Sequence, residues 1–202
     1  MLGRLPRLSQ RQPLPDAARW RLFVAAPLPE MAAARVWETT AAVRTAHPMV
    51  RWLPINKLHL TLVFLGETDP SRIEALAAAV EGVAGAHQPF YVATGDAGGR
   101  VGGRRDGVAW LRLAEGGYEV AQLSLDVDDA IGSHTFDARN APRPHLTLAR
   151  RATQGAIDDL RTVSDRIQLG WTVEQIVLFR SYTGPGGSRY EQLASATLGT
   201  SP

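Results

Sequence analysis

The 202-residue chain contains no cysteine and only one lysine, Lys57. Without cysteine, the protein can form no disulfide, bind no metal through thiolates and use no cysteine nucleophile. No apolar run reaches the length of a membrane-spanning helix, and the N-terminus lacks the continuous apolar stretch of a secretory signal. We therefore expect a cytoplasmic protein that has no membrane segment.

Positive charge is carried almost entirely by arginine, which supplies 21 of the 22 basic residues. The formal net charge is only +2, so charge alone does not indicate a nucleic-acid partner. Guanidinium groups bind phosphate in a bidentate geometry, but a general coding bias would give the same composition. The arginine content therefore permits a phosphate-bearing substrate without indicating one.

The pattern of apolar residues predicts an α+β protein with largely antiparallel sheet, because strands and helices are mixed and several strands are joined by hairpins. Residues 1–17 contain three prolines and are predicted to form a flexible N-terminal tail, followed by a single bilobal domain over 18–202. Strands are expected at 20–28, 58–66, 90–98, 107–113, 143–150, 171–183 and 189–198, and helices at 30–46, 69–86, 118–131 and 152–167.

The sequence His-Leu-Thr-Leu occurs twice, as 59–62 and as 145–148, with the two histidines 86 residues apart. Side chains alternate between the two faces of a strand. Each motif therefore places its leucines on one face, suited to a core, and presents its histidine and threonine on the other. The repetition suggests a weak internal duplication that builds two similar lobes facing each other.

Two histidines on facing lobes are suited to acid–base catalysis, because the ordinary pKa of histidine is about 6.5. Cleavage of a phosphodiester needs one group that removes a proton from the attacking oxygen and one that gives a proton to the leaving oxygen. Thr61 and Thr147 can donate hydrogen bonds to the phosphoryl oxygens, and no metal or cofactor is then required. For either histidine alone, a structural role inside the core is the competing interpretation.

A metal site is a second alternative, but cysteine is absent and no acidic residue shares the His-Thr face of either motif. The remaining histidines, His47, His87 and His134, fall at the ends of predicted elements and are expected on the surface.

Several segments resemble the two-histidine phosphoesterase superfamily, specifically its 2′-5′ RNA ligase-like group of RNA 2′,3′-cyclic phosphodiesterases. They are RLFVAAPLP near the start, RWLPINKLHLTLVFLGE and RPHLTLAR around the motifs, and IVLFRSYTGPGGSRYEQLA near the end. The resemblance implies two pseudo-twofold-related lobes around a central cleft. It also implies that His59 is the proton donor, His145 the proton acceptor and Arg150 a phosphate ligand.

Strand alternation disagrees with the last assignment, because Arg143, and not Arg150, shares the face of His145. A bulge or strand end after Ala149 would remove the conflict, and Arg143 and Lys57 remain geometric alternatives. The stretch 95–107 departs from the family pattern. We expect its loop, 98–107, to be mobile. Two interpretations of its three arginines, Arg100, Arg104 and Arg105, stay open: they contact backbone phosphates of the substrate, or they belong to an ordinary solvated loop.

The expected activity is metal-independent hydrolysis of a terminal 2′,3′-cyclic phosphate on RNA or an oligonucleotide by a monomer, leaving a 2′-phosphate. The same site run in reverse would join RNA ends through a 2′-5′ bond. One alternative is a related enzyme that acts on a small nucleotide or ADP-ribose cyclic phosphate. The other is a non-catalytic RNA-binding module.

Overall fold

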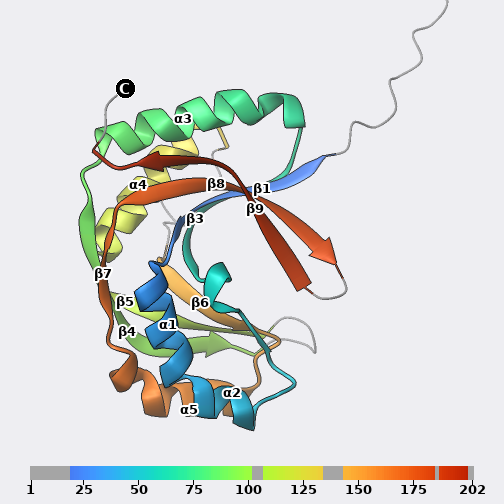
Figure 1. Ribbon diagram of the computed structural model, residues 1–202, viewed down its shortest axis with the longest axis vertical. Helices are drawn as coiled ribbons and strands as arrows, with labels where there is room; N and C mark the ends of the chain where they lie inside the picture. The colour runs from blue at the N-terminus through green and yellow to red at the C-terminus, as the bar shows by residue number, and fades with distance from the viewer. Residues whose placement is uncertain (1–18, 102–106, 134–142, 185–186, 200–202) are drawn as a thin grey trace, which may run out of the picture.

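The computed structural model describes residues 19–101, 107–133, 143–184 and 187–199 (Figure 1). Its strands are β1 (Trp20–Pro27), β2 (Arg51–Trp52), β3 (His59–Thr68), β4 (Phe90–Arg100), β5 (Val108–Glu115), β6 (His145–Arg150), β7 (Gly170–Val173), β8 (Gln175–Gly184) and β9 (Gly187–Thr197). Its α-helices are α1 (Glu30–Thr39), α2 (Ala41–Ala46), α3 (Ile73–Ala86), α4 (Gly117–Ala130) and α5 (Gln154–Val163). Three short 3₁₀ segments are η1 (Ile55–Lys57), η2 (Pro70–Arg72) and η3 (Ser164–Ile167).

One curled antiparallel sheet of nine strands passes through the whole fold, in the order β7-β4-β5-β6-β3-β1-β8-β9, with β2 paired to β6. The two histidine strands, β3 and β6, are neighbours at its centre. Outward from β3 come β1, β8 and β9, and outward from β6 come β5, β4 and β7. The sheet thus has two matching halves, which confirms the predicted α+β architecture of two related lobes.

Helices flank the sheet at both ends, as Figure 1 shows. Helix α3 packs on β8 and β9 of one half, and α5 packs on β4 of the other. Helix α4 follows β5 in the chain but contacts β3, so it ties the second half to the first. Within the described ranges, no helix combines the length and apolar character needed to cross a bilayer.

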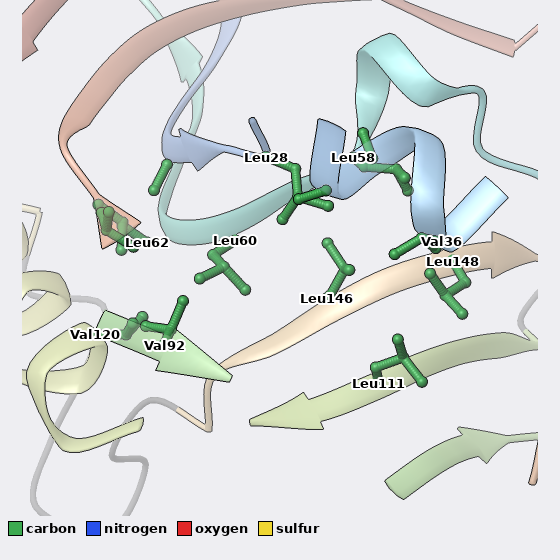
Figure 2. Packing of buried hydrophobic residues seen from close by; sticks show 14 of the residues in the cluster. Leu28, Val36, Leu58, Leu60, Leu62, Val92, Leu111, Val120, Leu146 and Leu148 are labelled. Atoms are coloured by element: carbon green, nitrogen blue, oxygen red, sulfur yellow. The ribbon is translucent and has the colours of Figure 1, made fainter. Parts of the chain in front are cut away.

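The leucines of both motifs lie in the core, as alternation predicts. Leu60 and Leu146 are fully buried, and Leu58, Leu62 and Leu148 are at most 4% exposed. Figure 2 shows Leu60 between the two histidine strands above Leu146, with Leu148 near Val36 of α1 and Leu62 on the side of Val120 of α4. Burying a leucine side chain stabilises a fold by about 1.5–3 kcal/mol, so the leucine face holds the histidine strands in place.

Two predicted elements are divided in the structure. The helix expected over 30–46 breaks at Thr40, whose hydroxyl donates to the carbonyl of Val36 at 2.8 Å. The strand expected over 171–183 breaks at Glu174, and its two parts pair at opposite ends of the sheet, β7 with β4 and β8 with β1 and β9. The helix expected over 69–86 begins with the 3₁₀ segment η2, which Asp69 caps: its carboxylate accepts from the Ser71 amide at 2.9 Å.

The predicted glycine-rich loop begins later than expected, since Gly98, Gly99 and Arg100 continue β4 and pair with β5. The glycines allow close packing here: a Cβ at Gly98 would lie 2.6 Å from the indole nitrogen of Trp110, and one at Gly99 would lie 2.4 Å from Ile157. Arg100 is exposed. Arg104, Arg105, His134 and the predicted tail at 1–17 lie outside the described residues.

Candidate active site

The two histidine motifs meet through their second residues. Leu60 pairs with Leu146 in the antiparallel contact between β3 and β6. In that register, one step along each strand brings His59 toward Thr147 and Thr61 toward His145. Segments far apart in sequence are thereby joined at one point, and each histidine is placed beside the threonine of the other motif.

Both imidazoles are held in the same way by their own strands. Nδ1 of His59 donates to the carbonyl of Lys57 at 2.8 Å, and Nδ1 of His145 donates to the carbonyl of Arg143 at 2.9 Å. A carbonyl oxygen only accepts, so Nδ1 carries the hydrogen in each case. In the neutral rings the lone pair is therefore on Nε2, which can accept a proton, and in the charged rings Nε2–H can donate one.

Aromatic rings surround His59. The ring of Phe23 lies 5.2 Å from the imidazole, and the edge-on ring of Tyr190 lies 5.6 Å away. Burial among these groups is the main cause that lowers the pKa of His59 to about 4, although the hydrogen bond to Lys57 opposes it. The nearby positive charges of Arg150 and His145 lower the same pKa further. His59 is therefore neutral at pH 7 in the free protein.

The surroundings of His145 are more open. Its side chain is exposed, and the ring of Trp110 lies 5.6 Å from it. Trp110 pairs with Thr147 across β5 and β6. Thr61 is half-buried, whereas Thr147 is only 8% exposed. The His-Thr face is thus less evenly exposed to solvent than strand alternation suggests, because Trp110 lies beside Thr147.

A β-bulge follows each motif threonine. Along β5 and β6, Trp110 pairs with Thr147 and the adjacent Ala109 pairs with Ala149, so Leu148 is an extra residue. An extra residue reverses the alternation of the side chains that follow. Ala149 therefore turns into the core, fully buried, and Arg150 turns outward. The conflict at Arg150 is resolved by a bulge that comes one residue earlier than the position anticipated from the sequence.

The first motif has the same irregularity. Along β1 and β3, Ala25 pairs with Thr61 and Val24 pairs with Val63, so Leu62 is the extra residue. The side chain that turns outward after it is Phe64, which is 60% exposed. Phe64 and Arg150 each come five residues after their motif histidine. They occupy matching positions in the two halves of the sheet but carry opposite chemistry.

A cleft of about 910 Å³ opens beside His59. Its lining includes the aromatic residues Phe23, Trp52, Phe64 and Tyr190 and the cations Arg21, Arg51, Lys57, Arg150 and Arg151. No aspartate or glutamate belongs to the lining that the described residues provide. His145, Thr61, Thr147 and Arg143 do not line it directly, so the cleft leads up to the histidine pair from the side of His59. Sequence reasoning missed its aromatic wall and Arg21, Arg51 and Arg151.

The alternative phosphate ligands are placed differently. Lys57 lines the cleft, but its ammonium donates to the carbonyl of Ser188 at 2.5 Å. Arg143 is exposed and contributes its carbonyl to His145. Of the two candidates that line the cleft, Arg150 is the one whose charge lowers the pKa of His59.

Two histidines outside the motifs form side-chain pairs. His47 lies 2.8 Å from Asp159, and His87 lies 2.9 Å from Asp126, both measured from Nε2 to a carboxylate oxygen. Both histidines are half-buried. Among the described residues, no three histidine or acidic side chains gather as a metal site would require.

Comparisons with known proteins show the family of the chain. Residues 28–185 match the family model of the 2′-5′ RNA ligase superfamily. The RNA 2′,3′-cyclic phosphodiesterase of Thermus thermophilus is 31% identical over 191 residues, which cover 88% of this chain and 90% of that protein. The Escherichia coli protein of the same name is 28% identical, over 86% of this chain and 93% of its own.

Solved structures show the same fold. The crystal structure of the Thermus thermophilus protein TT0787 superposes with a TM-score of 0.67 at 27% identity, covering 89% of this chain and 98% of that one. Escherichia coli LigT in complex with 3′-AMP gives a TM-score of 0.67 at 24% identity, covering 91% and 99%. Together with the curated relatives, the fold makes this chain a phosphodiesterase of the two-histidine class. Within that class, the chain belongs to the 2′-5′ RNA ligase superfamily.

Proposed function

We propose that this phosphodiesterase hydrolyses a terminal 2′,3′-cyclic phosphate on RNA to a 2′-phosphate, with the two motif histidines as acid and base and without a metal. The single observation that supports the proposal best is the pairing of Leu60 with Leu146. It brings together two imidazoles whose Nδ1 atoms are both bound to carbonyls, leaving two Nε2 atoms for proton transfer.

His145 acts as the base in this proposal. Its exposed side chain can meet water, and its Nε2 takes one proton from the attacking water molecule. The water oxygen bonds to phosphorus, the bond between phosphorus and the 3′-oxygen breaks, and the 3′-oxygen receives a proton from Nε2 of His59. The step leaves His145 protonated and His59 neutral, and exchange with solvent restores both.

The acid role of His59 needs a proton that the free protein does not hold at pH 7, since its pKa is lowered to about 4. The cyclic phosphate itself supplies the missing stabilisation. A negative charge about 4 Å from the imidazolium contributes about 4 kcal/mol at an effective dielectric constant of about 20, which corresponds to about 3 pKa units. Substrate binding would thus bring His59 to a pKa of about 7, where it can donate.

The phosphoryl oxygens are held by Arg150, Thr61 and Thr147. Arg150 supplies a permanent charge with several donors, and each threonine hydroxyl lies next to the histidine of the other motif. These donors stabilise the charge that builds on the phosphoryl group in the transition state.

RNA is favoured as the substrate by the relatives named above and by the aromatic lining of the cleft. Bases stack on aromatic side chains with little dependence on sequence. The same site would also accept a 5′-hydroxyl end in place of the attacking water: the 5′-oxygen bonds to phosphorus, the bond to the 3′-oxygen breaks, and the RNA ends are joined through a 2′-5′ bond.

The test is incubation of the protein with RNA that ends in a 2′,3′-cyclic phosphate, in the presence of EDTA, with ³¹P NMR of the product. A 2′-phosphate formed by the wild-type chain, and lost in His59→Ala and in His145→Ala, is the expected result. A 3′-phosphate product, or turnover that stops with EDTA and returns with zinc or manganese, contradicts the mechanism. Tight RNA binding with no turnover would instead favour a non-catalytic RNA-binding module.

A further inference from the structure

We propose that Arg51, together with Arg151, binds a second phosphate, the one on the 5′ side of the terminal nucleoside. The inference rests on the proposed function and specifies its substrate: a nucleotide end that carries two phosphates, one reacting at the histidines and one held by these arginines. An RNA chain supplies the second phosphate as its last internucleotide diester, and a small nucleotide would supply it as a 5′-phosphate.

The first observation is a pair of like charges. Arg51 of β2 is the direct cross-strand partner of Arg150 of β6. Directly opposed residues in an antiparallel pair have side chains on the same face, about 4.5–5.5 Å apart at Cβ, and like charges there are destabilising. Both arginines line the cleft. A fold that places two guanidinium groups side by side on one face of a cleft is suited to anions between and around them.

The second observation is the lack of carboxylate partners. Among the described residues, Arg51, Arg150 and Arg151 form no ion pair, whereas the cleft cation Arg21 lies 3.9 Å from Glu67. Lys57 is bound to the carbonyl of Ser188. Charge-assisted hydrogen bonds to phosphate are the strong ones, and these three arginines keep their donors available for such bonds.

The third observation is the backbone of Arg151. It has a φ of 55°, and it is the sole residue other than glycine with a positive φ in the described part of the chain. In an extended strand, Arg150 and Arg151 would point to opposite faces. The left-handed turn lets both consecutive side chains line the cleft. Such a conformation costs about 1–2 kcal/mol for a residue with a Cβ, and strained residues of this kind cluster at ligand sites.

The direction of the second phosphate follows from the positions of the arginines. Arg150 acts on the pKa of His59 and is therefore close to the reacting phosphate. Arg51 extends from β2 toward the start of β9, where its guanidinium lies 3.7–3.9 Å from the position that a Cβ on Gly187 would take. It thus reaches from β2 to the β8–β9 hairpin beside Arg150, so a phosphate held at Arg151 and Arg51 would be adjacent to the one held at Arg150.

The experiment compares four substrates: adenosine 2′,3′-cyclic phosphate, its 5′-phosphorylated form, the dinucleotide ApA ending in a 2′,3′-cyclic phosphate, and the same dinucleotide with an uncharged methylphosphonate linkage. We expect Arg51→Gln to lower kcat/KM for the charged dinucleotide by about 10- to 100-fold. The same variant should change kcat/KM for adenosine 2′,3′-cyclic phosphate and for the methylphosphonate dinucleotide less than threefold. Arg151→Gln should show the same pattern with a smaller loss.

Arg189→Gln is the matched control. Arg189 is on the β8–β9 hairpin that Arg51 approaches, but it stacks on Tyr182, 4.6 Å from its ring, and does not line the cleft. It should leave all four substrates unchanged. If the 5′-phosphorylated mononucleotide depends on Arg51 as strongly as the dinucleotide does, a 5′-phosphate satisfies the site. If only the dinucleotide does, the site reads RNA. Either pattern supports a second phosphate site.

An equal loss on charged and uncharged substrates would overturn the inference, since Arg51 would then act on the reacting phosphate or on the fold. Failure of the proposed function has a separate signature, which is that the wild-type chain hydrolyses none of the four. In that case the second site is tested by calorimetry, which compares the affinities of the wild-type chain and of Arg51→Gln for the same four ligands. Equal affinities of the two proteins for the charged dinucleotide refute the second site.

Discussion

Binding of a phosphate diester should make the protein take up a proton at His59. The free imidazole, half-buried beside Phe23 and Tyr190, has a pKa of about 4, chiefly because its charged form is desolvated there. At pH 6 only about 1% of it is then charged. A bound anion about 4 Å away moves the pKa to about 7, so about 0.9 proton is taken up at pH 6, about 0.5 at pH 7 and about 0.1 at pH 8.

The assay is isothermal titration calorimetry of the His145→Ala variant with adenosine 2′,3′-cyclic phosphate, in buffers of different ionisation enthalpy. This variant should bind the ligand without hydrolysing it, and the cyclic diester stays a monoanion over the pH range. The slope of the observed enthalpy against the buffer ionisation enthalpy gives the number of protons. His59→Asn in the same background is the control and should give a slope near zero.

A slope near zero for the His145→Ala variant at pH 6 would refute the reasoning, because His59 would then remain neutral with the anion bound and could not be the acid. The roles of the two histidines would have to be exchanged. A slope that persists in the His59→Asn control would place the proton on another group.

Three further predictions concern activity and stability. His59→Ala and His145→Ala should each lower kcat by about 10²–10⁴-fold, and the wild-type pH–rate profile should be bell-shaped. The double variant should lose far less than the product of the two single losses. If steady-state assays show that the two losses multiply, the histidines do not act in one shared step. The pKa of His59 is lowered on folding, so the unfolded chain binds more protons than the folded chain between about pH 6.5 and pH 4. The free energy of unfolding in urea should therefore fall by about 2.5 kcal/mol from pH 7 to pH 4.5, and His59→Gln should remove this loss. Arg151→Gly should raise the free energy of unfolding by up to about 1 kcal/mol while weakening the binding of charged dinucleotides, and a stability that falls would show that the left-handed backbone carries no strain.

The parts of the fold that repeat a simple local pattern could be predicted from the sequence. The alternation in both His-Leu-Thr-Leu segments correctly placed the leucines in the core, because a strand has only two faces. The break at Glu174 could not be predicted in this way. Apolar residues continue on both sides of Glu174 and Gln175 with no glycine or proline between them, and the division depends on which distant strands each part pairs with.

The site was predictable in its residue types but not in its geometry. The sequence indicated His59 and His145 as partners, but their meeting through Leu60 and Leu146 is a contact across 86 residues that no local pattern contains. The same holds for the bulge at Leu148, which is visible only in the register with β5. Arg51 was missed because its significance comes from its cross-strand partner, Arg150.

The matching positions of Phe64 and Arg150 give the site a sense of direction. A sheet with two equivalent halves would present its histidines to a diester in two equally good orientations, and each histidine would then serve as acid in half of the encounters. The flat, uncharged ring on one side and the guanidinium on the other remove that degeneracy, since a phosphate is drawn to the second and a base to the first. Under the proposed function, we therefore expect a nucleic-acid strand to enter the cleft in one direction only. Side chains that take no part in proton transfer would then decide which of the two motif histidines serves as acid and which as base.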